Sequence, residues 1–129
     1  MRILVDTHLL LWATAKSRRL PRVARQMLED PANELLHSAA SLWEIAIKAA
    51  LRRSDFVVDV RLLRAALPRM GFVELPVTGA HAERLFLLPP IHKDPFDRML
   101  VAQSLVEPLV LLTNDAQLVE YGTFVRLVE

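Results

Sequence analysis

Four acidic residues stand where the sequence predicts that strands end or helices begin. Asp6 directly follows an apolar run at the start of the chain, and two residues separate Asp115 from the apolar run 109–112. Glu44 lies one turn into a predicted helix, and Asp97 lies in the first turn of another. Carboxylate oxygens are the protein ligands that Mg²⁺ and Mn²⁺ prefer. These residue types would therefore support the chemistry of a divalent cation and the water that it activates.

Predicted strands and helices alternate along the chain and must position these acids. The clearest helix repeats Leu42, Ile45, Ala46 and Ala49 at spacings of three and four, whereas the strands are continuous apolar runs. The predicted strands are 2–5, 34–37, 72–75, 109–112 and 124–128, and the predicted helices are 7–14, 21–29, 41–52, 59–69, 79–88, 95–106 and 115–120. This pattern predicts a parallel sheet covered by helices on both faces, with its site at the carboxyl ends of the strands.

Helix capping is an alternative explanation for each acid taken singly. Asp6 and Asp115 are suited to capping the helices that follow them. Ser41 and Glu44 match the capping box S-x-x-E, which would employ Glu44 without any metal. For any one of these residues, capping is the more common role.

The acids as a group are harder to explain by capping. Asp94 precedes Pro95 as a predicted N-cap, which places Asp97 at the third helical position, where a carboxylate interacts favourably with the helix dipole. However, carboxylates brought within about 5 Å repel by roughly 3 kcal/mol per pair at an effective dielectric of about 20. A convergent cluster of four therefore indicates a cation among them, and hard oxygen ligands favour Mg²⁺ or Mn²⁺ over zinc.

The composition of the 129 residues is that of one globular domain, 1–129, with 53% hydrophobic and 24% charged residues. The absence of cysteine excludes disulfide scaffolds, thiolate zinc sites and cysteine nucleophiles. The longest uncharged stretches, 7–15 and 35–43, have nine residues each, whereas a membrane span needs about twenty. Asp6 and His8 interrupt the one apolar stretch that resembles a signal peptide, so a cytoplasmic protein is expected.

The charge balance gains meaning once the four acids are set apart. The chain has 16 basic and 15 acidic residues, a net charge of +1, and 13 of the basic residues are arginine. Without the four acids, 11 acidic residues remain against 16 basic ones, so the rest of the molecule carries +5. An acidic hole in a basic surface suits a metal-dependent phosphodiesterase, in which the surface binds the polyanion and the hole binds the cation.

Four segments occur in an order and at a spacing that resemble the PIN domain family, closest to the VapC-type toxins of bacterial toxin–antitoxin pairs. They are DTHLLLWA at 6–13, SLWEIAIK at 41–48, HKDPFDR at 92–98 and TND at 113–115. The resemblance covers essentially the whole chain. It implies a three-layer α/β/α sandwich with a central, mainly parallel sheet, Mg²⁺- or Mn²⁺-dependent cleavage of RNA, a small antitoxin protein as partner, and a homodimer.

By position, the resemblance assigns the family's four metal-binding acids to Asp6, Glu44, Asp97 and Asp115. We expect Asp6 and Asp97 to hold the metal most directly, and Glu44 and Asp115 to act through water, because Mg²⁺ usually keeps several waters. The resemblance also implies that the hydroxyls of Thr7 and Thr113 bond to these carboxylates, and it leaves Asp94 as the cap.

Other residues have roles that the sequence leaves open. Asn114 stands where the family commonly has a basic residue. Arg98 would bind either a phosphate or a carboxylate. His8 and His92 are conceivable general bases, although an ordinary polar role is the favoured interpretation for both. The apolar residues Leu9, Leu10, Leu11, Trp12 and Trp43 are interpreted as core, with a groove or a dimer face as the alternative.

Alternative functions differ in the signals they require. A haloacid-type phosphatase needs a second Asp two positions after the nucleophile, and Asp6-Thr7-His8 lacks it. A Rossmann nucleotide site is excluded because no G-x-G-x-x-G occurs among three glycines. The remaining alternative is a catalytically silent PIN-like module that binds RNA or protein.

Overall fold

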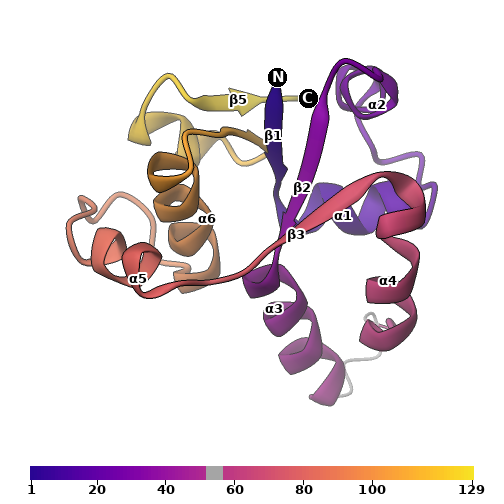
Figure 1. The fold of residues 1–129 in the computed structure, drawn as a ribbon, viewed down its shortest axis with the longest axis horizontal. Coiled ribbons are helices and arrows are strands. Elements are labelled where there is room, and N and C mark those ends of the chain that lie inside the picture. The colour runs from indigo at the N-terminus through magenta and orange to yellow at the C-terminus, as the bar shows by residue number, and fades with distance from the viewer. Residues whose placement is uncertain (52–56) are drawn as a thin grey trace.

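The computed structural model describes residues 1–51 and 57–129 and contains one five-stranded sheet (Figure 1). Its strands are β1 (Arg2–Val5), β2 (Glu34–Ser38), β3 (Phe72–Leu75), β4 (Val110–Thr113) and β5 (Val125–Leu127). The order in the sheet is β3-β2-β1-β4-β5, and every neighbouring pair is parallel. The carboxyl ends of β1, β2 and β4 therefore meet at the middle of one sheet edge, as the sequence predicts.

Helices cover both faces of this sheet, which gives the expected α/β/α sandwich (Figure 1). The helices are α1 (Thr7–Thr14), α2 (Arg22–Glu29), α3 (Ala39–Ala50), α4 (Val60–Ala66), α5 (Gly79–Phe86) and α6 (Pro95–Val106), with short 3₁₀ helices η1 (Pro68–Met70) and η2 (Ala116–Tyr121). None of the helices within 1–51 and 57–129 is long and apolar enough to cross a bilayer.

Two hydrophobic cores lie on the two faces of the sheet. Ile3 and Val5 of β1 enter one core, which includes Leu9 of α1 and residues of α2, α3 and α4. Leu4 of β1 enters the other core together with Leu100 of α6. The central strands β1, β2 and β4 are buried on both faces, which explains why their sequences are mainly continuous apolar runs, whereas the edge strands β3 and β5 are partly exposed.

Helix starts follow the predicted caps with one error. Asp6, Asp94 and Asp115 each accept a backbone N–H at the start of α1, α6 and η2 respectively, as predicted. The predicted capping box is wrong, because α3 begins at Ala39 with Ser38 as its N-cap. Ser41 and Glu44 therefore lie inside the helix.

Several helices begin or end one or two residues away from the predicted positions, and one predicted helix is divided in two. Pro21 is the residue before α2 rather than its first helical residue. The helix predicted at 59–69 is divided into α4 and η1, with Pro68 opening the second piece, since proline cannot continue the α-helical hydrogen bonds. Gly71 ends this segment with a φ of 89°, in the left-handed region that favours glycine, as predicted. Arg52, the last residue of the helix predicted at 41–52, lies outside the described residues.

Candidate active site

The four predicted acids come from elements that share one edge of the sheet. Asp6 follows β1, Glu44 lies in the helix after β2, and Asp115 comes two residues after β4. Asp97 lies in the first turn of α6. The negative charges of Asp6 and Glu44 both act on Asp97, where they raise its pKa. Among the described residues, Asp97 and Asp115 present ligand atoms within 4.8 Å of each other and of His92, whereas Asp6 and Glu44 lie outside that group and act on Asp97 through their charges.

Each carboxylate oxygen of Asp6 accepts a hydrogen bond from a neighbouring group. Its Oδ1 accepts the N–H of Leu9 at 2.9 Å, and its Oδ2 accepts the hydroxyl of Thr113. Burial raises the pKa of Asp6, and the bonds from Thr113 and Leu9 oppose that shift. The bond from Thr113 is the one that the resemblance implies. Thr7 does not do the same, because its hydroxyl donates to Ser41 instead.

Glu44 has one paired and one unpaired carboxylate oxygen. Its Oε2 forms an ion pair with Nζ of Lys48 at 2.7 Å, one turn further along α3. Its Oε1 is buried and has no hydrogen-bond partner among the residues that the structure describes. A buried carboxylate oxygen without a donor is costly, and a cation or a water held by a cation would satisfy it. The donor set therefore fits a divalent ion.

Asp97 has a strongly raised pKa at this edge. Its pKa is raised to about 7, first by burial, then by the charges of Asp94 and Asp6, with a smaller contribution from Glu44, while His92 lowers it. A carboxylate held at this pKa is half-protonated near neutral pH. A divalent cation would replace that proton and stabilise the ionised form.

His92 bridges two of the acids. Its Nε2 lies 2.8 Å from Oδ2 of Asp115 and 3.5 Å from Oδ2 of Asp97. Its Nδ1 accepts the backbone N–H of Asp94 at 3.0 Å, so in the neutral ring the proton must be on Nε2. Although His92, Asp97 and Asp115 present ligand atoms within 4.8 Å of one another, this tautomer makes His92 a hydrogen-bond donor to the acids. The interpretation of His92 as an ordinary polar residue missed this contact.

Comparison with known proteins shows which family the chain belongs to. A family model described as "PIN domain" matches residues 3–123. The chain belongs to the PIN domain family. This confirms the resemblance drawn from the four sequence segments. Each segment contains one of the four acids.

Among its relatives, this PIN domain is 29% identical over 121 residues to "Ribonuclease VapC22" of Mycobacterium tuberculosis (strain ATCC 25618 / H37Rv), covering 90% of this chain and 88% of the relative. It resembles the solved structure of VapBC2 from Rickettsia felis bound to a DNA fragment from their promoter, with a TM-score of 0.70 and 10% identity over 100% of both chains. It also resembles a toxin–antitoxin complex from Klebsiella pneumoniae, with a TM-score of 0.68 and 22% identity, covering 96% and 95% of the two chains. At these identities the two structures establish the shared fold.

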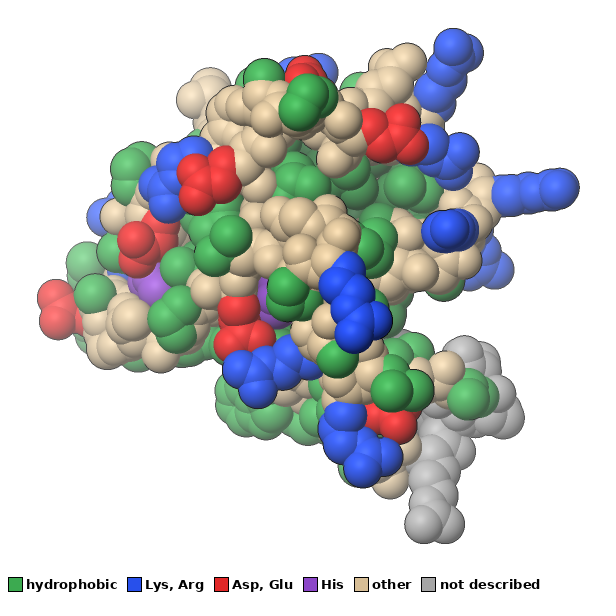
Figure 2. All heavy atoms as spheres, turned by 45° about the vertical axis from the view of Figure 1, so that its right-hand side comes forward, with side chains coloured by type: hydrophobic (Ala, Val, Ile, Leu, Met, Phe, Trp, Pro, Cys, Tyr) green, Lys and Arg blue, Asp and Glu red, His purple; other side chains and the backbone are tan. Residues whose placement is uncertain are grey.

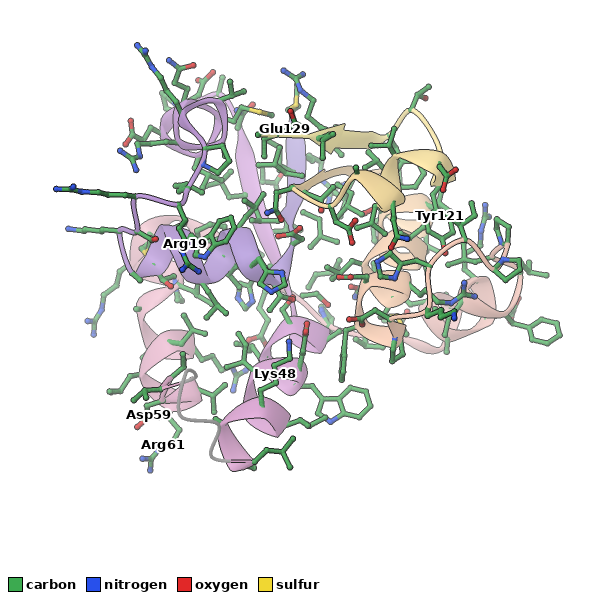
Figure 3. All side chains as sticks on the ribbon, turned by 180° about the vertical axis from the view of Figure 1, so that it is seen from behind. Arg19, Lys48, Asp59, Arg61, Tyr121 and Glu129 are labelled. Atoms are coloured by element: carbon green, nitrogen blue, oxygen red, sulfur yellow. The ribbon has the colours of Figure 1, made fainter. Side chains whose placement is uncertain are left out.

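Arg98 of this PIN domain holds the loop that carries His92. Its Nη1 donates to the carbonyl of Pro89 at 3.0 Å and to the hydroxyl of Tyr121 at 3.1 Å. The same Tyr121 oxygen accepts the backbone N–H of His92 at 3.0 Å. Tyr121 of η2 and Lys48 of α3 are seen on their separate elements in Figure 3. Of the two roles that the sequence left open for Arg98, an ion pair with a carboxylate is not formed among the described residues, and no motif in the sequence pointed to Tyr121.

The apolar residues that the sequence assigned to the core differ in burial. Leu9 and Leu10 are fully buried, which confirms the core interpretation for them. Trp43 is 64% exposed and contacts Phe96 edge-on, with 5.3 Å between ring centroids, so the core interpretation is wrong for this residue. His8 is exposed and lies against Trp12.

Proposed function

We propose that this single PIN domain is a metal-dependent endoribonuclease and the toxin of a toxin–antitoxin pair. The observation that carries the proposal is the unpaired buried oxygen of Glu44 beside an Asp97 whose pKa is raised to about 7. Both features describe a cluster with more negative charge than its protein neighbours neutralise. The relative called a ribonuclease and the toxin–antitoxin complexes that share the fold support the same function.

Asp6 and Asp97 would hold Mg²⁺ or Mn²⁺ directly, and Glu44 and Asp115 would act through water. When bound, such an ion supplies a water of lowered pKa and neutralises charge on the attacked phosphodiester. Thr113 holds Asp6 Oδ2 and the Leu9 N–H holds Oδ1, so this carboxylate is fixed before any ion arrives. A fixed ligand costs little reorganisation on binding.

The remaining side chains orient the carboxylates or water. Lys48 fixes Oε2 of Glu44 and leaves the buried Oε1 without a partner in the described structure, so that Oε1 would be free to accept a proton from a water. The Nε2 proton of His92 holds Asp115 Oδ2, and Arg98 and Tyr121 hold the loop that carries His92. Carboxylates held in this way would need little rearrangement to bind a divalent ion and its water.

The test is Mn²⁺ binding and RNA cleavage in Asp6→Asn and Asp97→Asn. The expected result is loss of both, with cleavage by the unaltered protein abolished by EDTA. Asp30→Asn is the matched control, because Asp30 also accepts a backbone N–H, that of Ala32, and lies outside the cluster. Mg²⁺-dependent cleavage that survives in the two site variants contradicts the proposal. An unaltered protein that binds no Mn²⁺ and cuts no RNA supports the silent binding module instead.

A further inference from the structure

Five basic residues lie within the ten residues from 16 to 25, on the α1–α2 connection and the first turn of α2. We call them the basic patch: Lys16, Arg18, Arg19, Arg22 and Arg25. All five are exposed, and no acidic residue occurs between Asp6 and Glu29. Figure 2 shows Lys and Arg side chains standing out on the side of the molecule that carries α2. The patch is the densest cationic segment of the chain.

The cations of the basic patch are free, whereas several others are paired. Within 1–51 and 57–129, Arg2, Arg61 and Arg64 each form an ion pair with an acid, but no member of the patch does. Arg25 donates only to the carbonyl of Ser17, at 3.5 Å. Arg69 and Arg84 are also exposed and form no ion pair in the described structure, but each has no other Lys or Arg within four positions of it in the sequence. The patch therefore presents a group of unused guanidinium donors.

The position of the basic patch is unfavourable for stability alone. Arg22 and Arg25 occupy the first and fourth residues of α2, at the positive end of its dipole, and they repel each other at a spacing of three. The first turn of α2 contains no acid, and Pro21 gives it no side-chain cap. Acidic residues would stabilise α2 here. Their absence indicates that the patch serves an anionic ligand.

A groove extends from Arg19 of the basic patch to Lys48 of α3, with Asp59 and apolar side chains also in its wall. It has a volume of about 780 Å³ and is lined by His8, Arg19 and Lys48, among others. Lys48 is the ion-pair partner of Glu44. Figure 3 labels Arg19, on the connection between α1 and α2, and Lys48 on α3. An extended ligand in this groove would therefore run from Arg19 to the lysine that is paired with Glu44.

A second hollow continues the path beyond Arg19. It has a volume of about 610 Å³ and is lined by Arg18, Arg19, Arg22 and Arg25, with Glu29 and Glu129 also in its wall. Neither acid is within ion-pair distance of these arginines in the described structure. Because Arg19 lines both hollows, the basic surface continues from the groove onto α2.

We propose that the basic patch binds the phosphodiester backbone of the RNA strand whose scissile phosphate lies at the acidic cluster, an inference that rests on the proposed function. A strand with one phosphate at the cluster carries further phosphates at regular intervals along the groove. The planar fork of arginine binds two phosphate oxygens at once. Four free arginines in succession therefore match a polyanionic strand better than a single charged group.

The test compares two double variants in an Asp97→Asn background, so that RNA is bound without being cut. Arg22→Ala/Arg25→Ala removes two members of the patch, and Arg69→Ala/Arg84→Ala removes two isolated, exposed arginines with the same charge change. The probe is a fluorescein-labelled single-stranded RNA of mixed sequence, titrated from about 50 to about 200 mM salt.

We expect the patch variant to bind this RNA about three- to tenfold more weakly for each arginine–phosphate pair removed, with a salt slope smaller by roughly 0.7 for each pair. The control variant keeps the affinity and slope of its background. In the protein with its native acids, the patch variant raises KM for long RNA and leaves kcat unchanged, while cleavage of a dinucleotide, too short to reach α2, is unaffected.

Two results would overturn this inference and leave the proposed function intact. One is equal RNA affinity and salt slope in the two double variants, with cleavage retained. The other is binding of polyglutamate that equals RNA binding and disappears in the patch variant, which assigns the patch to an acidic protein segment. If no variant, including the protein with its native acids, cleaves RNA, the proposed function fails as well.

Discussion

Two histidines in this molecule are bonded in the same way within opposite electrostatic surroundings. His81 accepts the N–H of Thr78 on Nδ1 at 3.0 Å and bonds to Glu107 through Nε2 at 2.7 Å. His92 accepts the N–H of Asp94 on Nδ1 at 3.0 Å and bonds to Asp115 through Nε2 at 2.8 Å. Each ring is thereby held in one orientation, with Nε2 directed at a carboxylate.

The difference lies in what surrounds each pair. His81 is fully buried between α5 and α6, where the ring also closes the capping box of α5. The one unpaired atom there is the amide oxygen of Gln103, which carries no net charge. Around His92, by contrast, Asp97 is crowded by further acids and an oxygen of Glu44 is unpaired. The His81–Glu107 pair completes the start of α5. The His92–Asp115 pair belongs to a cluster with more negative charge than its neighbours neutralise.

The largest expected effect comes from removing one acid of the unbalanced cluster. Asp97→Asn should lower RNA cleavage on the order of a thousandfold or more, because a metal ion contributes several kcal/mol to transition-state stabilisation. Single-turnover cleavage of a labelled RNA measures it. Glu107→Gln, which alters the carboxylate bonded to His81, should cleave RNA at the original rate. Equal losses in both variants would erase the distinction between the two regions.

Replacing the two histidines themselves should give opposite results. His92→Gln keeps a donor but not the ring geometry and should weaken Mn²⁺ binding about 10- to 100-fold, as loss of a residue that orients metal ligands does. His81→Gln should leave Mn²⁺ affinity unchanged and lower the free energy of unfolding by about 1–3 kcal/mol. Calorimetric Mn²⁺ titration and urea unfolding of both variants check this. Unchanged Mn²⁺ affinity in His92→Gln would show that its bond to Asp115 is merely structural.

The pH dependence of metal binding should follow Asp97. With its pKa raised to about 7, a proton competes with the ion below that pH, so Mn²⁺ affinity should rise about tenfold between pH ~6 and pH ~8 and then level off. Isothermal titration across this range measures the slope. Asp97→Asn should bind Mn²⁺ weakly and without this pH step, whereas His81→Gln should retain the step.

The smallest expected effect is on stability without metal. Because the pKa of Asp97 is raised in the folded state above its unfolded value, the folded protein loses stability as pH rises from about 4 to about 7. At pH ~8 in EDTA, Asp97→Asn should therefore raise the melting temperature by roughly 2 °C or more. Differential scanning calorimetry measures this. A marked fall would mean that the position of Asp97 in the first turn of α6 matters more than the repulsion.

Much of this arrangement follows from the sequence because it is local. Asp6, Asp94 and Asp115 follow strands or precede helices, so their caps are set by neighbours two or three residues away. The alternation of apolar runs and helices determines the parallel sheet, and that sheet brings the acids to one edge. The capping role that the sequence offered as the alternative for Asp6 is observed, and its role as a metal ligand stays a prediction.

The parts that the sequence did not predict depend on distant contacts. The ring of His92 meets Asp115 across 23 residues and its backbone meets Tyr121 across 29. No spacing rule relates such positions. Ser38 and Ser41 are both plausible caps for α3, and packing of Ser41 against Thr7 accompanies the choice of the earlier one. Trp43 was misplaced because an apolar side chain in a helix does not reveal which face it occupies.

The acids around Asp97 hold a divalent ion if the proposed function is correct. A crystal soaked in Mn²⁺ and measured at the manganese absorption edge tests this most directly. We predict one anomalous peak bound by carboxylate oxygens of Asp6 and Asp97, with Nε2 of His92 still directed at Asp115. The absence of a peak there, or a peak bound by Nε2 of His92 in place of Asp6, would contradict it.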